Sequence, residues 1–256
     1  MFLILKRILI AMFIFSYFHL FLCHMAMESL SYAKQIIYFH YRGEINTLKV
    51  LELAKDRALE LGVNSVVIAS ETGRSALKAL KVFEKTGIKL IVVTHYPAKT
   101  IGPKGDIPIG LNRPEYAHVK KFLEERGVVI VQGTRPFAGI ERSLGWNSPT
   151  PESFIDKTLE IFGSGTKIAV EVALMATDAG VVDEGDIIVS LGGTYKGLDT
   201  ALVVKTSYSF HFFTHFEVLE IIAKPYHPGK RVPEHADELW RGNMDQYYEP
   251  IDLSYI

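Results

Sequence analysis

The stretch of residues 64–80 constrains the fold most, because it combines a short apolar run, a polar loop and a helical pattern. Residues 65–69 are apolar and mostly β-branched, whereas residues 75–83 have helix-forming side chains at helical spacing. The loop between them brings backbone N–H groups, hydroxyls and a guanidinium to a helix N-terminus, where the helix dipole favours an anion. An ordinary N-cap is the alternative, since serine and threonine also favour that position. We predict a phosphate-binding loop made of Ser70, Glu71, Thr72, Gly73, Arg74 and Ser75.

The residues around this stretch repeat the alternation of strand and helix. Short strands are predicted at residues 35–39 and 89–94, and an amphipathic helix at residues 44–61. Short connections between alternating strands and helices predict a parallel sheet with helices on both faces. Ligands of such sheets bind at the carboxyl ends of the strands, where Ser70 and Thr94 stand.

The remainder of the chain shows weaker patterns. Residues 96–114 are rich in proline and glycine and predict a long loop. Residues 167–179 fit either a strand or a helix, and their length favours a buried helix. Further helices are predicted at residues 115–126, 137–144 and 151–162, and strands at 128–131, 186–191, 200–206 and 216–223, the last two as a pair at one edge of the sheet.

The sequence VVIASETGRSA at residues 66–76 resembles the strand, phosphate loop and helix of the C-terminal α/β domain of pyruvate kinase, which holds an allosteric sugar phosphate. The similarity continues in IKLIVVT at residues 88–94 and DEGDIIVSLGG at residues 183–193. In layout the chain is most similar to stand-alone, mainly archaeal relatives of that domain, some of which bind flavin mononucleotide (FMN). The resemblance covers about residues 35–225 and implies a three-layer α/β/α fold with a mostly parallel central sheet and an antiparallel edge.

The glycine-rich loop of residues 192–200 is a second candidate for ligand contact. Its glycines allow close approach, and it supplies hydroxyl, amine and carboxylate groups, although a tight connection between two strands fits the pattern equally well. The matching loop of the pyruvate kinase domain closes over the sugar phosphate, which implies ligand contact here too. To the phosphate loop the expected site therefore adds Thr94, His95, Gly192, Gly193, Thr194, Lys196, Gly197, Asp199 and Thr200.

The resemblance implies an FMN-binding protein, with the phosphate on residues 72–75 and the ring system near the loops after Thr94 and Gly192. The alternative is a non-catalytic sensor that binds a phosphorylated metabolite, such as a sugar phosphate, through the same loop. Pyruvate kinase activity is not expected, because the chain has no counterpart of the catalytic barrel. We identify no nucleophile–base pair, so that a flavin-dependent oxidoreductase would take its chemistry from the flavin.

Charge and cysteine content exclude other kinds of site. A formal net charge of −1 with scattered lysines and arginines argues against nucleic-acid binding. The one cysteine, Cys23, lies in the N-terminal apolar stretch, so the folded body is expected to have no disulfide and no cysteine-based metal site. His211 and His215 have helical spacing, but their neighbours look like a strand and the acid of a zincin motif is missing. We predict ordinary packing or surface histidines there and no metal site.

Two further motifs are interpreted as structural features. Gly163-Ser-Gly165 lacks the third glycine of a dinucleotide fingerprint and follows a predicted helix rather than a strand. Glu171 and Asp178 lie on the predicted helix of residues 167–179, where exposed carboxylates are the expected reading. Neither motif is assigned to the site.

The two ends of the chain differ from the predicted α/β body at residues 28–225. Residues 8–23 are apolar and follow Lys6 and Arg7, which is typical of a signal peptide or membrane anchor. An upstream start assigned to a protein that begins at Met25 or Met27 is the favoured explanation for residues 1–27, and implies a cytoplasmic protein. Residues 226–256 form a polar tail whose aromatic residues predict docking on the body or on a second subunit, and hence a homo-oligomer.

Overall fold

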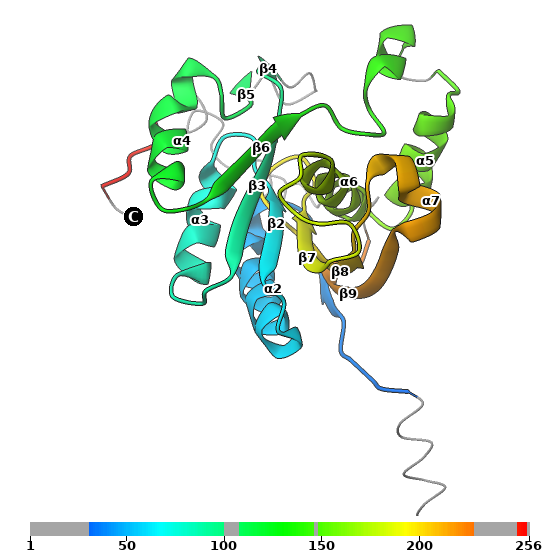
Figure 1. Ribbon diagram of the computed structural model, residues 1–256, viewed down its shortest axis with the longest axis horizontal. Coiled ribbons are helices and arrows are strands. Elements are labelled where there is room, and N and C mark those ends of the chain that lie inside the picture. Colours follow the sequence, from blue (N-terminus) through cyan, green and yellow to red (C-terminus); the bar gives the residue numbers. More distant parts are fainter. Residues whose placement is uncertain (1–30, 100–107, 146–147, 228–249, 255–256) are drawn as a thin grey trace, which may run out of the picture. The chain divides into compact units, whose positions relative to one another are not determined.

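The computed structural model of this protein describes residues 31–99, 108–145, 148–227 and 250–254 (Figure 1). The chain divides into two units, Met1–Gln35 and Ile36–Ile256, and the helices and strands of the described residues lie in the second. The N-terminal apolar extension at residues 1–27 lies outside the described residues, and so do Trp240, Tyr247 and Tyr248 of the C-terminal tail. No helix of the described ranges combines the length and the apolar character that crossing a membrane requires.

Seven strands form one sheet in the order β1-β9-β8-β7-β2-β3-β6. Of these, β8 runs antiparallel to both of its neighbours, while every other pairing in the sheet is parallel. The strands near the middle are almost continuously apolar, as expected of strands that are covered on both faces. Their bounds are β1 (Ile37–Phe39), β2 (Ser65–Ala69), β3 (Lys89–His95), β6 (Val129–Gly133), β7 (Ile187–Gly192), β8 (Thr200–Lys205) and β9 (Glu217–Pro225).

Helices cover both faces of the sheet, because successive strand side chains point to opposite sides. Val66 and Ile68 of β2 belong to one core cluster, and Val67 between them belongs to the other. The first cluster includes side chains of α2 (Thr47–Leu61), α3 (Arg74–Phe83) and α4 (Ala117–Glu124). The second is built mainly from α6 (Ser164–Asp178), with α5 (Pro151–Glu160) and α7 (Phe212–His215) packed against it (Figure 1).

These observations confirm the predicted α/β fold with its mostly parallel sheet and its antiparallel side. The segment with two readings, residues 167–179, is helical and forms most of α6. Thr150 caps α5, since its side chain accepts the N–H of Ser153 while Ser153 Oγ accepts the N–H of Thr150. The predicted short helix near residue 140 is the 3-10 helix η3 (Ile140–Leu144).

Three local predictions were wrong in detail. The pair of strands predicted at one edge of the sheet, β8 and β9, is not outermost, because β1 pairs in parallel with β9. The long loop of residues 96–114 contains the short antiparallel strands β4 (Ala98–Lys99) and β5 (Pro108–Ile109), and then the 3-10 helix η2 (Pro114–Tyr116). The residues around His211 and His215 form the 3-10 helix η4 (Ser209–His211) and α7 rather than a strand.

The described end of the C-terminal tail lies against the first core cluster. Ile251 and Leu253 pack there as partly buried side chains. His118 on α4 donates from Nε2 to the carbonyl oxygen of Ile251 at 3.1 Å. This part of the tail therefore docks on the body of its own chain.

Candidate functional site

A pocket of about 640 Å³ lies at the carboxyl ends of four neighbouring parallel strands. Segments that follow each strand line it: Ser70 after β2, Tyr96 after β3, Arg135 after β6 and Gly193 after β7. This is where ligands collect in open α/β sheets. Eleven of the fifteen residues predicted for the site line this pocket, namely Ser70, Glu71, Thr72, Arg74, Ser75, Thr94, His95, Gly193, Thr194, Lys196 and Gly197.

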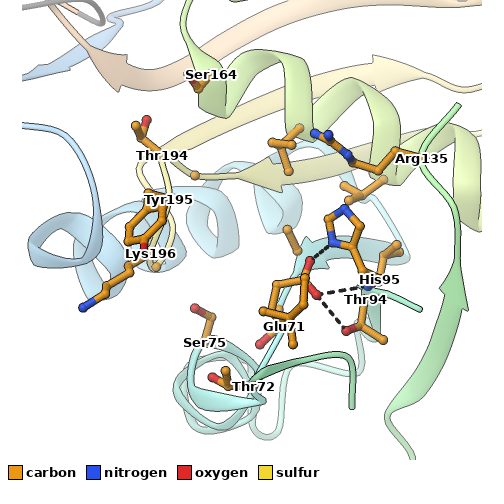
Figure 2. A pocket seen from close by; sticks show the side chains of 18 of the residues that line it. Glu71, Thr72, Ser75, Thr94, His95, Arg135, Ser164, Thr194, Tyr195 and Lys196 are labelled. Atoms are coloured by element: carbon orange, nitrogen blue, oxygen red, sulfur yellow. Dashed lines mark hydrogen bonds and ion pairs between the residues drawn. The ribbon is translucent and has the colours of Figure 1, made fainter. Parts of the chain in front are cut away.

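The loop between β2 and α3 forms one wall (Figure 2). Thr72 and Ser75 are buried side chains at the start of the helix, and the hydroxyl of Ser70 accepts the N–H of Ala76 at 3.3 Å. Gly73 has a φ of 85° and no room for a side chain, because a Cβ there would overlap Val119 of α4. Gly73 therefore lets the loop pack tightly on α4, while its neighbours face the pocket.

Glu71 links the ends of β2 and β3 through its carboxylate. Its Oε2 accepts the hydroxyl of Thr94 at 3.2 Å and the N–H of His95 at 3.0 Å. Its Oε1 is hydrogen-bonded to Nδ1 of His95, so the imidazole is fixed between Glu71 and Arg135 (Figure 2). With Nδ1 engaged, Nε2 is the ring nitrogen of His95 left for a ligand in the pocket.

The loop after β7 forms the opposite wall, across from Thr72 and Ser75 (Figure 2). Tyr195 adopts a positive φ of 67°, and the N–H of Lys196 bonds back to the carbonyl oxygen of Thr194 at 2.8 Å. A side chain at Gly193 would overlap the carbonyl oxygen of Gly197. The glycines of this loop thus serve its tight turn, which places Thr194, Tyr195 and Lys196 on the pocket.

Four of the predicted site residues, Gly73, Gly192, Asp199 and Thr200, do not line the pocket. Asp199 lies behind the wall, where it accepts the N–H of Gly43 at 2.8 Å, the hydroxyl of Thr200 at 2.9 Å and hydrogen bonds from Thr194. Gly192 sits where the first turn of α6 crosses β7. In this arrangement these residues support the loop, and their contact with a ligand stays a prediction.

Asp199 provides a test of that supporting role. Burial raises the pKa of this carboxyl above its ordinary value of 3.8, although hydrogen bonds from Gly43, Thr194 and Thr200 lower it in part. A raised folded pKa means that the folded protein holds a proton that the unfolded chain has lost. The Asp199→Asn variant has no proton to lose at this position. As the pH rises above 3.8 through the raised pKa, the free energy of unfolding of the wild type should therefore fall relative to that of the variant, by at most about 1.4 kcal/mol per pH unit.

Denaturant unfolding of both proteins over a pH series measures this difference. Other titrating groups are common to the two proteins and cancel. If the free energies of unfolding of the two proteins differ by the same amount at every pH, the carboxyl of Asp199 does not titrate as its burial requires.

Sequence reasoning missed several cations of the pocket. Among the residues that the structure describes, seven lysine and arginine side chains line it against three glutamates, so the lining carries an excess of positive charge although the chain is nearly neutral. Those not predicted are Arg42, Lys99, Arg135, Arg142 and Lys167. The sequence could have indicated Arg135, because this residue follows a strand whose carboxyl end lies at the same edge of the sheet as Ser70 and Thr94.

Buried carboxylates hold three of these cations in place. Glu171 was expected to be exposed but is fully buried, because α6 lies between the sheet and α5. Its carboxylate accepts a hydrogen bond from Arg135 at 3.2 Å and one from the N–H of Phe137 at 3.2 Å. Burial raises the pKa of Glu171, while Arg135 and Lys167 act to lower it. Asp156 is buried and pairs with Arg142 at 3.1 Å and with Lys167 at 3.2 Å.

Helix α6 also contributes its N-terminus to the pocket. Ser164, Lys167 and Ile168 of its first turns are lining residues. Gly163 is the N-cap with a φ of 122°, and a Cβ at Gly165 would overlap Thr200. Gly165 therefore allows a close approach of α6 to Thr200, and Gly163 supplies the positive φ at the start of the helix.

The molecule is thus an α/β protein with a cation-rich pocket at the carboxyl ends of a mostly parallel sheet. The chain belongs to the pyruvate kinase family of alpha/beta domains: the family model described as "Pyruvate kinase, alpha/beta domain" matches residues 42–204. The match includes the loop between β2 and α3, the loop after β7 and helix α6. It ends before η4, α7 and β9.

Proposed function

We propose that this protein binds FMN in the pocket, with the phosphate at residues 72–75 and the ring system between the loops that follow Thr94 and Gly192. The observation that carries this proposal is the meeting of two helix N-termini in one electropositive cavity. The first turns of α3 and α6 both line the pocket, and seven cationic side chains surround it. Helix N-termini and arginine side chains are the groups that bind phosphate best.

The size and lining of the pocket are suited to the rest of a mononucleotide. About 640 Å³ lies within the range of roughly 300–1,000 Å³ that small-molecule sites occupy. Val93, Ile168, Val172 and Met175 supply apolar surface from β3 and α6, against which a flat ring system can pack. The residues therefore fit a ligand with one anionic and one aromatic end.

His95 would contact the polar edge of such a ring. Glu71 holds its Nδ1, so the imidazole keeps one orientation and offers Nε2 for a hydrogen bond. Bound FMN would supply electron and hydride transfer, and the protein would supply position and electrostatics. The residues assigned here bind and orient a ligand.

A phosphorylated metabolite with more than one anionic group, such as a sugar phosphate, is the second candidate. It is favoured by the distribution of the cations, because lysine or arginine side chains line the pocket at the start of both helices, Arg74 at α3 and Lys167 at α6. In that case the N-terminus of α3 would bind one anionic group and the N-terminus of α6 another. The protein would then act as a non-catalytic sensor.

Colour and titration distinguish the two candidates. If the first is correct, the purified full-length chain is yellow with flavin absorbance, or the colourless protein quenches FMN fluorescence at one site per chain. FMN should bind at least tenfold more tightly than riboflavin, which lacks the phosphate. A colourless protein that ignores FMN but gains thermal stability with a sugar bisphosphate would establish the second candidate instead.

A further inference from the structure

We propose that Glu184, His211 and His215 form a binding site for a divalent transition-metal ion such as Zn²⁺. One ligand atom of each side chain lies within 4.8 Å of those of the other two. Nδ1 of His211 is 2.8 Å from Oε1 of Glu184, and Nδ1 of His215 is 3.1 Å from the same oxygen. Two imidazoles and one carboxylate therefore converge on one point.

The fold brings this set together from two parts of the chain. His211 ends η4 and His215 ends α7, so their spacing of four residues places both rings on one side of a helical turn. Glu184 lies in the turn between α6 and β7 and supplies the acid that is missing from the histidine segment itself. The prediction of no metal site rested on a strand around the histidines and on the absence of a nearby acid in sequence.

Neighbouring contacts hold the two segments in position. Asp178, at the end of α6, accepts the N–H of Ser209 at 2.9 Å and its hydroxyl at 2.5 Å. Phe212, the first residue of α7, packs edge-on against Phe137 with ring centroids 5.0 Å apart. These contacts hold the residues that flank His211, so the segment needs little rearrangement to bind an ion.

The donor atoms select the type of metal. Imidazole nitrogen with carboxylate oxygen suits zinc, nickel, copper and cobalt ions, whereas magnesium and calcium prefer oxygen alone. With bonds of about 2.0–2.2 Å, ligand atoms around a tetrahedral zinc lie roughly 3.4 Å apart. The two histidine–glutamate separations, 2.8 and 3.1 Å, are slightly shorter than this, and the ligand atoms of the two histidines lie within 4.8 Å of each other. The side chains are 24% to 50% exposed, so an ion can enter and a water molecule can fill the fourth position.

The histidines lie beyond residue 204, where the match to the pyruvate kinase domain family ends. None of the three residues lines the large pocket. The proposed metal site is therefore separate from the proposed FMN site. A metal ion bound there would link α7 to the turn after α6 through its ligands.

Zinc titration of the full-length, untagged chain tests this proposal, with a chromogenic chelator as competitor. We expect one Zn²⁺ per chain, and a melting temperature that rises with Zn²⁺ but not with Mg²⁺. The loss of a residue that only hydrogen-bonds to a metal ligand already weakens metal affinity about 10- to 100-fold. Replacing a ligand itself, in His211→Ala, His215→Ala or Glu184→Gln, should therefore weaken Zn²⁺ binding at least about tenfold. All three variants should keep the melting temperature of the metal-free wild type and any FMN binding.

His118→Ala is the matched control, because it removes an exposed histidine from a different helix, α4. It should bind Zn²⁺ as the wild type does. Failure of the wild type to bind Zn²⁺ at micromolar concentration would overturn the proposal. So would binding that survives in the His211→Ala/His215→Ala double variant, which would place the metal elsewhere.

Discussion

Replacing Arg74 with alanine is expected to weaken FMN binding ten- to a hundredfold while leaving the fold intact. Arg74 is the first residue of α3 and lines the pocket beside Thr72 and Ser75. A hydrogen bond to a charged group contributes on the order of 1.5–3 kcal/mol, and each 1.4 kcal/mol is about a factor of ten in affinity. Fluorescence titration with FMN measures the loss. Ser75→Ala should act in the same direction but more weakly, because it removes a neutral hydroxyl.

Riboflavin and a second variant make this result specific. Riboflavin has the ring system without the phosphate, so Arg74→Ala should leave its weaker binding almost unchanged. Lys81→Ala removes a positive charge from the exposed last turn of the same helix and should not affect FMN. The free energy of unfolding of Arg74→Ala should stay within about 1 kcal/mol of the wild type, because a cation at a helix N-terminus opposes the dipole. Equal losses for FMN and riboflavin would rule out a phosphate at Arg74.

Replacing Gly192 with alanine is expected to destabilise the protein by about 3 kcal/mol, at the upper end of what overpacking costs. A Cβ there would overlap the carbonyl oxygen of Gly165 and lie 2.6 Å from the backbone nitrogen of Ala169. Both are backbone atoms of α6, so they cannot move aside as a flexible side chain would. For a domain of this size the melting temperature should fall by roughly 2–4 °C for each kcal/mol, measured by thermal unfolding without ligand.

Gly133→Ala is the matched control for this substitution. Gly133 ends β6, and a Cβ there would meet only Met175 Cε at 3.5 Å, an ordinary van der Waals distance. Its melting temperature should stay close to that of the wild type. If Gly192→Ala instead keeps its stability and loses only FMN affinity, Gly192 contacts the ligand, as the sequence prediction had it, and does not act through the crossing of α6 and β7.

Local sequence patterns were sufficient for much of the fold. The strand, loop and helix around residues 65–83 are formed within a residue of their predicted bounds, because hydrophobic spacing and turn residues act over a few positions. The carboxyl-end rule for parallel sheets then placed Ser70, Thr94 and their neighbours on one pocket. The same rule, applied to β6, would also have indicated Arg135.

Other features depended on residues that are far apart in the chain. Glu171 seemed exposed because helical spacing does not say how many layers pack around a helix, and α6 proved to be buried on nearly all sides. Asp199 and Gly192 belonged to a loop rich in ligand-binding groups, but contacts with Gly43 and with α6 place them behind the wall.

The sequence by itself therefore determined the type of each main element, the direction of the parallel strands and the loop that faces the pocket, because short-range spacing encodes them. The tertiary structure alone decided that β1 lies beside β9, that buried carboxylates hold Arg135, Arg142 and Lys167 at the pocket, and that Glu184 meets His211 and His215. The physical reason is that these contacts join surfaces from distant segments. They exist only once the helices have packed on the sheet and the cost of ordering the chain has been met.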